Sequence, residues 1–155
     1  MRWYTADFDA MSWHDVGVHG FRIVENGNGT AELQLDLDYI LEWLNAEKEG
    51  ALCFRIAQAT LQFHEVFGLR FSLDYVACSA GMSPFSIDRI RRESLRMPND
   101  RGDDSVCAAD GPWRWRIDLN WPEGFMEFEA TGFSQWMVGE VIEQNAQVLD
   151  PVDRL

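Results

Sequence analysis

Lysine is almost missing from this chain: Lys48 is the only one in 155 residues, and twelve arginines supply the other positive charges. Against 26 aspartates and glutamates, this leaves a formal net charge of −13. Binding to a nucleic-acid backbone or to an anionic membrane surface requires many basic side chains. We therefore expect neither a nucleic-acid nor a membrane partner, and the charge favours either a basic protein as the partner or no partner.

Cysteine is also scarce. Cys53, Cys78 and Cys107 are odd in number and have no C-x-x-C spacing, which argues against a disulfide scaffold and indicates a reducing compartment. We interpret Cys53 and Cys78 as small buried hydrophobic residues. No apolar run approaches the roughly 18 residues of a membrane helix, and the first nine residues lack a signal-peptide pattern. A cytoplasmic location follows as the expectation.

The chain contains few residues with which to build a catalytic centre. Its only histidines are His14, His19 and His64, too few and too scattered for a histidine-rich metal site. Serine-nucleophile motifs, phosphate-binding loops and dinucleotide fingerprints are absent from the sequence. We therefore expect no metal, no cofactor and no enzymatic activity.

A strict alternation of apolar and polar residues dominates residues 31–43. Leucine, tyrosine and tryptophan occupy one parity, and carboxylates occupy most of the other. Because successive side chains of a strand point to opposite faces, this run predicts a strand with one core face and one acidic face. The residues before it, 25–29, contain two Asn-Gly pairs, which are typical of a hairpin turn.

Similar patterns predict most of the remaining chain to be strand. A strand over 16–24 precedes the hairpin turn, and others are expected at 52–67, 69–75, 113–121 and 125–131, with Gly68 as a turn. Residues 83–96 fit a strand or a helix, and we favour the strand.

Two segments depart from this pattern. Residues 97–112 predict a long surface loop, and residues 140–149 allow one short helix.

These patterns predict the fold class. The 155 residues form a single domain, mainly β, with one antiparallel meander that forms a half-barrel or a sandwich and at most one or two short helices. The apolar parities supply the expected core: Leu35, Leu37, Tyr39, Phe71, Leu73, Trp115, Ile117 and Phe128. Trp113, Trp115 and Trp121 alternate with arginine and aspartate or asparagine, so we assign them to the core rather than to a carbohydrate-binding face.

The polar parities supply the candidate partner-binding surface. It consists of Glu32, Gln34, Asp36, Asp38, Glu42, Glu127 and Glu129. Carboxylates could also bind a hard cation, but no glycine-containing calcium loop accompanies them. Arg70, Arg114 or Arg116 could balance part of the charge of Glu32, Asp36, Asp38 and Glu42 across strands. The arginine-rich stretch over 89–101 is expected to pair with acidic side chains in the same way.

Trp13, His14 and Asp15 form the one triplet with the residue types of an acid-base or metal site. Two interpretations remain open. In one, His14 and Asp15, with His64, serve a small hydrolase or metal-dependent enzyme. In the other, which we favour, Trp13 packs in the core and Asp15 caps a turn.

Four segments together resemble a family of small uncharacterised bacterial proteins. They are the Trp13-His14-Asp15 triplet, residues 35–40 with Trp43, residues 57–63 and residues 127–133. Some members of that family are similar to immunity proteins of polymorphic toxin systems. The resemblance implies an acidic, cytoplasmic, non-enzymatic domain with variation in the 97–112 loop.

The sequence therefore predicts a non-enzymatic acidic binding protein, with inhibition of a basic toxin as one form of this function. A hydrolase using His14 and Asp15 is the alternative from another class. Association through a free edge strand is the third hypothesis.

Overall fold

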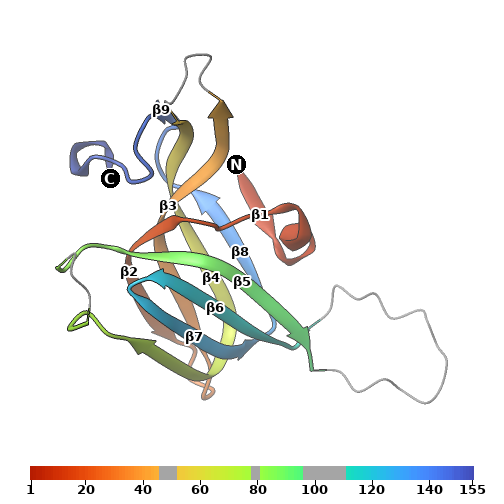
Figure 1. The fold of residues 1–155 in the computed structure, drawn as a ribbon. Coiled ribbons are helices and arrows are strands. Elements are labelled where there is room, and N and C mark those ends of the chain that lie inside the picture. Colours follow the sequence, from red (N-terminus) through yellow and green to blue (C-terminus); the bar gives the residue numbers. More distant parts are fainter. Residues whose placement is uncertain (46–51, 78–80, 96–110) are drawn as a thin grey trace.

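The computed structural model describes residues 1–45, 52–77, 81–95 and 111–155, and these residues form one antiparallel β-sheet (Figure 1). Two short 3-10 helices accompany it, η1 (Thr5–Ala10) and η2 (Pro151–Asp153). The mainly β, antiparallel prediction is thus confirmed. The strands are β1 (Arg2–Tyr4), β2 (Val16–Glu25), β3 (Ala31–Asn45), β4 (Leu52–Leu73), β5 (Phe85–Ser94), β6 (Trp113–Trp121), β7 (Glu123–Ala130), β8 (Gly132–Met137) and β9 (Ile142–Gln144).

The strand pairings return to their starting point. The order across the sheet is β1-β8-β4-β3-β2-β5-β6-β7, and β7 then pairs with the last part of β4. Six strands, β2 to β7, thereby form a closed circuit of antiparallel pairs, while β1, β8 and β9 extend it from β4. The circuit gives the sheet an inner side, where the core lies, and an outer side.

Alternation along the strands sets which residues enter that core. Six of the eight residues predicted to be buried are buried, including Leu35, Leu37 and Trp115 with no exposed surface. Phe71 and Leu73 are half-buried, because they lie where β4 has left β3 and pairs with β7. Trp121, also assigned to the core, is 47% exposed at the end of β6.

β4 is a single bent strand, so the predicted turn at Gly68 is wrong. Glu65 and Gly68 both have positive φ, at 54° and 66°. These residues deflect the strand without reversing it, and the pairing changes there from β8 (Ala59–His64) to β7 (Phe67–Leu73). A local glycine signal could not distinguish a turn from a bulge, because both need the same backbone conformation.

The other local predictions have mixed outcomes. The hairpin turn before β3 is confirmed, with positive φ at Gly27 and Gly29. The strand favoured within 83–96 is confirmed for Phe85–Ser94, as β5. The helix expected over 140–149 is wrong: this segment contains β9, and the Gln144 side chain then donates to the carbonyls of Ala146 and Val148. Residues 97–110 of the predicted loop lie outside the described residues.

Candidate functional site

Polar side chains gather on the outer side of four neighbouring strands, β2, β3, β4 and β8. We call this surface the outer polar face. Its side chains alternate with buried core residues such as Leu33, Leu35 and Phe63, which explains why they point away from the core. The outer polar face is made of Arg22, Glu32, Gln34, Asp36, Thr60, Gln62, His64 and Ser134.

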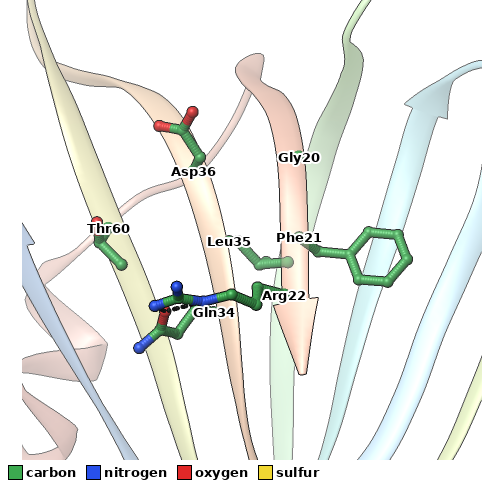
Figure 2. Close-up of a pocket in the computed structure, with 7 residues that line it drawn as sticks. All are labelled: Gly20, Phe21, Arg22, Gln34, Leu35, Asp36 and Thr60. Carbon is green, nitrogen blue, oxygen red and sulfur yellow. Dashed lines mark hydrogen bonds between the residues drawn. The ribbon is translucent and has the colours of Figure 1, made fainter. Parts of the chain in front are cut away.

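A hollow of about 290 Å³ lies on this face between β2, β3 and β4 (Figure 2). Gly20 leaves it open, because a Cβ built there would meet no atom within 4 Å. The Arg22 guanidinium donates to Gln34 Oε1 at 2.6 Å and 3.1 Å, and Asp36 and Thr60 complete the polar lining. The hollow therefore combines one carboxylate and one guanidinium with neutral hydrogen-bonding groups.

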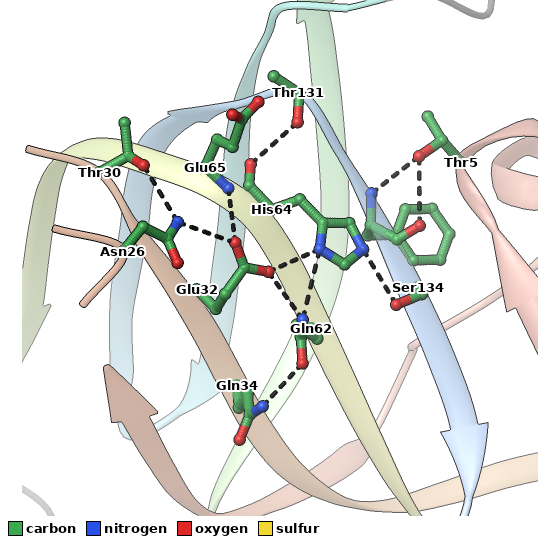
Figure 3. A network of polar contacts seen from close by, with 11 residues as sticks. Thr5, Asn26, Thr30, Glu32, Gln34, Gln62, His64, Glu65, Thr131 and Ser134 are labelled. Atoms are coloured by element: carbon green, nitrogen blue, oxygen red, sulfur yellow. Dashed lines mark hydrogen bonds and ion pairs between the residues drawn. The ribbon is translucent and has the colours of Figure 1, made fainter. Parts of the chain in front are cut away.

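Glu32 is the centre of a hydrogen-bond network next to the hollow (Figure 3). Its carboxylate accepts from Asn26 Nδ2 and the backbone N–H of Glu65, both at 3.1 Å, and from Gln62 Nε2 at 2.7 Å. His64 Nδ1 lies 2.6 Å from Glu32 Oε2. Burial alone would raise the pKa of Glu32, but these donors outweigh it and hold that pKa below its ordinary value.

His64 connects this carboxylate to a serine. Its Nε2 lies 3.0 Å from the Oγ of Ser134, on the neighbouring strand β8. The three residues form a Glu-His-Ser arrangement (Figure 3). Sequence reasoning missed Ser134, because residues after 133 show no clear period and 70 residues separate it from His64.

Asp38 is not part of the exposed surface, which corrects the prediction. Its side chain has no exposed area. His19 Nε2 lies 2.7 Å from Asp38 Oδ2, the backbone N–H of Leu149 donates to the same oxygen at 2.9 Å, and Arg154 pairs with the other oxygen. Residues 149–155 cover this position, and alternation along β3 could not indicate that cover.

Residues 149–155 also affect the protonation of His19. Burial and the nearby Arg154 guanidinium lower the pKa of His19, although Asp36 opposes them. A neutral His19 can donate its Nε2–H to Asp38, which leaves the full negative charge of that carboxylate facing Arg154.

The remaining predicted partner-binding carboxylates each have an arginine. Glu42 lies 3.2 Å from Arg55, Glu127 lies 3.2 Å from Arg116, and Glu129 lies 3.5 Å from Arg114. Arg114 and Arg116 thus pair with β7, and not with the β3 carboxylates that they were predicted to balance. The structure thus brings Glu32, Gln34 and Asp36 together on the outer polar face, whereas Glu127 and Glu129 belong to ion pairs between β6 and β7.

The arginine-rich stretch is likewise paired where it is described. Arg91 lies 2.7 Å from Asp118, and Arg89 lies 3.0 Å from Asp88. Arg92 lies 3.3 Å from Asp9 and covers the rings of Phe8 and Trp113. These contacts confirm the internal pairing that the sequence predicts for this stretch.

His14 and Asp15 do not meet His64. His14 is exposed, 3.5 Å from Asp15 and 3.7 Å from Asp88, and it lines a separate hollow of about 270 Å³ that Asp15 does not line. Asn120 and Gln147 hold the Asp15 carboxylate at 2.8 Å and 3.3 Å. Trp13 is buried, as predicted.

Within the described ranges, no group of three or more His, Cys, Asp or Glu side chains is arranged to hold a metal ion. The expectation of no metal stays a prediction. None of the described helices is long and apolar enough to cross a membrane. Cys53 is a free cysteine and half-buried rather than fully buried, and Cys78 and Cys107 lie outside the described residues.

Comparisons of the chain with protein-family models, with curated proteins and with solved structures found no match.

Proposed function

We propose that this chain is an acidic binding protein that engages a basic segment of a partner protein through the outer polar face. The observation that supports it is a contact within the chain itself. Arg154 already binds on this side of the sheet, with its guanidinium 2.6 Å from Asp36 and paired with Asp38.

The residues around Arg154, which include the turn of η2, also contact the sheet through backbone donors. The backbone N–H of Leu155 donates to Gln58 Oε1 at 2.8 Å, and that of Leu149 donates to Asp38 at 2.9 Å. Side chains of β3 and β4 thus accept both a guanidinium and backbone donors. Charge-assisted pairs of this kind are the stronger hydrogen bonds in proteins.

Asp36 is the carboxylate best placed to receive a second cation. Its side chain is 44% exposed in spite of its contact with Arg154, and it lines the open hollow at Gly20. A basic side chain of a partner can enter that hollow and meet Asp36. The net charge of −13 would steer a basic partner toward the protein and add to the rate of association.

Inhibition of a basic enzyme, such as a nuclease toxin, is one form that this binding could take. The resemblance to immunity proteins supports that form, and a cytoplasmic location belongs to the same proposal. The His14 and Asp15 hydrolase receives no comparable support, because His64 lies in a different site.

Peptide binding tests the proposal. The probe is a synthetic nine-residue peptide of alternating arginine and threonine, with the glutamate-threonine peptide as a negative control. Isothermal titration calorimetry at low and moderate salt measures its affinity for the parent, Asp36→Lys and Gly20→Leu. We expect each variant to bind about tenfold more weakly, because one removes the carboxylate and the other fills the hollow.

Glu127→Lys is the matched control, since it makes the same charge change at a half-exposed carboxylate that also pairs with an arginine. It should weaken binding by less than about threefold, the effect of net charge alone. Equal losses in Asp36→Lys and Glu127→Lys, or no binding by the parent, would refute recognition at the outer polar face.

A further inference from the structure

The Glu32, His64 and Ser134 side chains have the connectivity of an activated serine. We propose that Ser134 is a nucleophile that His64 and Glu32 activate, and that it reacts with small carboxylic esters. The contacts run in sequence, from Glu32 Oε2 to His64 Nδ1 at 2.6 Å and from His64 Nε2 to Ser134 Oγ at 3.0 Å. This order of acid, imidazole and hydroxyl is the one that nucleophilic serine catalysis requires.

The protonation of the imidazole follows from its partners. Glu32 accepts from Asn26, Glu65 and Gln62 and is held as a carboxylate, so it can only accept from His64. His64 Nδ1 must therefore carry the hydrogen that faces Glu32. In the neutral ring Nε2 is then the acceptor, and the Ser134 hydroxyl donates to it.

Hydrogen bonds from Thr5 fix the backbone next to Ser134. Thr5 Oγ1 accepts from the backbone N–H of Phe133 at 2.8 Å and donates to its carbonyl at 3.2 Å. Thr5 also packs closely on Gly132, where a Cβ would lie 2.3 Å from Thr5 Oγ1. Thr5 thus fixes the backbone next to Ser134, and a nucleophile reacts faster when it is held in position.

Ser134 is 8% exposed, and His64 is the more open of the two side chains. The His64 side chain is 36% exposed, so the imidazole meets solvent. Trp136 follows Ser134 by two residues on β8 and pairs with Thr60, which lines the hollow at Gly20. The hollow at Gly20 therefore lies on the same face of the sheet as Ser134.

The reaction needs no cofactor. Ser134 Oγ attacks the ester carbonyl carbon as His64 Nε2 takes the hydroxyl proton, and Glu32 stabilises the imidazolium. The intermediate collapses with cleavage of the bond to the leaving oxygen, which receives the proton from His64. Water then attacks the acyl-serine by the same route, which releases the carboxylic acid and restores Ser134.

A fluorophosphonate probe tests this nucleophile directly. Attack by Ser134 forms a bond to phosphorus and expels fluoride, and the hydroxyl proton leaves through His64. Intact-mass spectrometry should show one adduct on the parent, and fragmentation should place it on Ser134. The adduct should be absent from Ser134→Ala and form at least about tenfold more slowly in Glu32→Gln and His64→Gln.

Ser72→Ala is the matched control, since Ser72 is an exposed serine of the same sheet, and it should label like the parent. Circular dichroism shows which variants fold, and Glu32→Gln keeps the test open if His64→Gln does not fold. No adduct on Ser134 under excess probe, or an equal rate in a folded Glu32→Gln, would overturn the proposal. Peptide binding at Asp36 does not depend on either result.

Discussion

His19 and Asp38 share a hydrogen bond of 2.7 Å on the outer side of the sheet, where alternation predicts only solvated side chains. The carboxylate has no exposed area, and the C-terminal residues that cover it supply Arg154 as its counter-charge. A buried carboxylate requires such partners, because an unpaired charge away from water is costly. Residues 149–155 are thus tied to the sheet by a polar contact.

Removal of this carboxylate should destabilise the protein. Asp38→Ala leaves His19 and the Leu149 N–H without their acceptor and leaves Arg154 with Asp36 alone, and we expect a loss of about 3 kcal/mol in the free energy of unfolding. Urea denaturation measures it. Asp36→Ala is the control, since Asp36 is 44% exposed, and it should cost less than about 1 kcal/mol. Equal losses of unfolding free energy in the two variants would mean that Asp38 is not the main residue that holds 149–155 on the sheet.

Leu37 tests the assignment of the β3 faces. The side chain has no exposed surface, so Leu37→Ala should cost about 2 to 5 kcal/mol through lost burial and the remaining cavity. Val152, which is 86% exposed, should tolerate alanine within about 0.5 kcal/mol. A Leu37→Ala variant with the denaturation midpoint of the parent would contradict the assignment.

Gly124 and Gly20 should respond to alanine in opposite ways. A Cβ at Gly124 would lie 2.2 Å from the carbonyl oxygen of Ser72, so Gly124→Ala must disturb the pairing of β7 with β4 and should cost about 1 to 3 kcal/mol. A Cβ at Gly20 meets nothing within 4 Å. Gly20→Ala should be neutral or slightly stabilising, by up to about 1 kcal/mol. Thermal unfolding of the two variants measures both changes in stability.

Glu32 should contribute a pH-dependent share of the stability. Because its pKa is lower in the folded protein, its contribution is present above the ordinary glutamate value of 4.5 and is lost as the pH falls through the folded pKa. Glu32→Gln should therefore be less stable than the parent near pH 7, and the difference should shrink as the pH drops toward about 3. Unfolding curves over this range measure it. A difference that stays constant would show that the carboxylate charge does not contribute.

Strand positions were accessible from the sequence because the pleat has a period of two. The alternations over 31–43 and 113–121 correctly predicted β3 and β6 and most of their core faces, although Trp43 and Trp121 near the strand ends are exposed. The weaker patterns failed where two structures share one local signal, as with the bulge at Gly68 and the irregular tail after Ile142. In those places the backbone follows its neighbours more than its own propensity.

The sequence by itself determined the fold class, the net charge and the side of the sheet on which most side chains lie. Only the tertiary structure decided which polar side chains meet. Glu32, His64 and Ser134 come from three strands, and Asp38 receives its cover from a residue 116 positions later. The physical reason is that the direction of a side chain follows from the local pleat, whereas its partners depend on the pairing and register of distant segments.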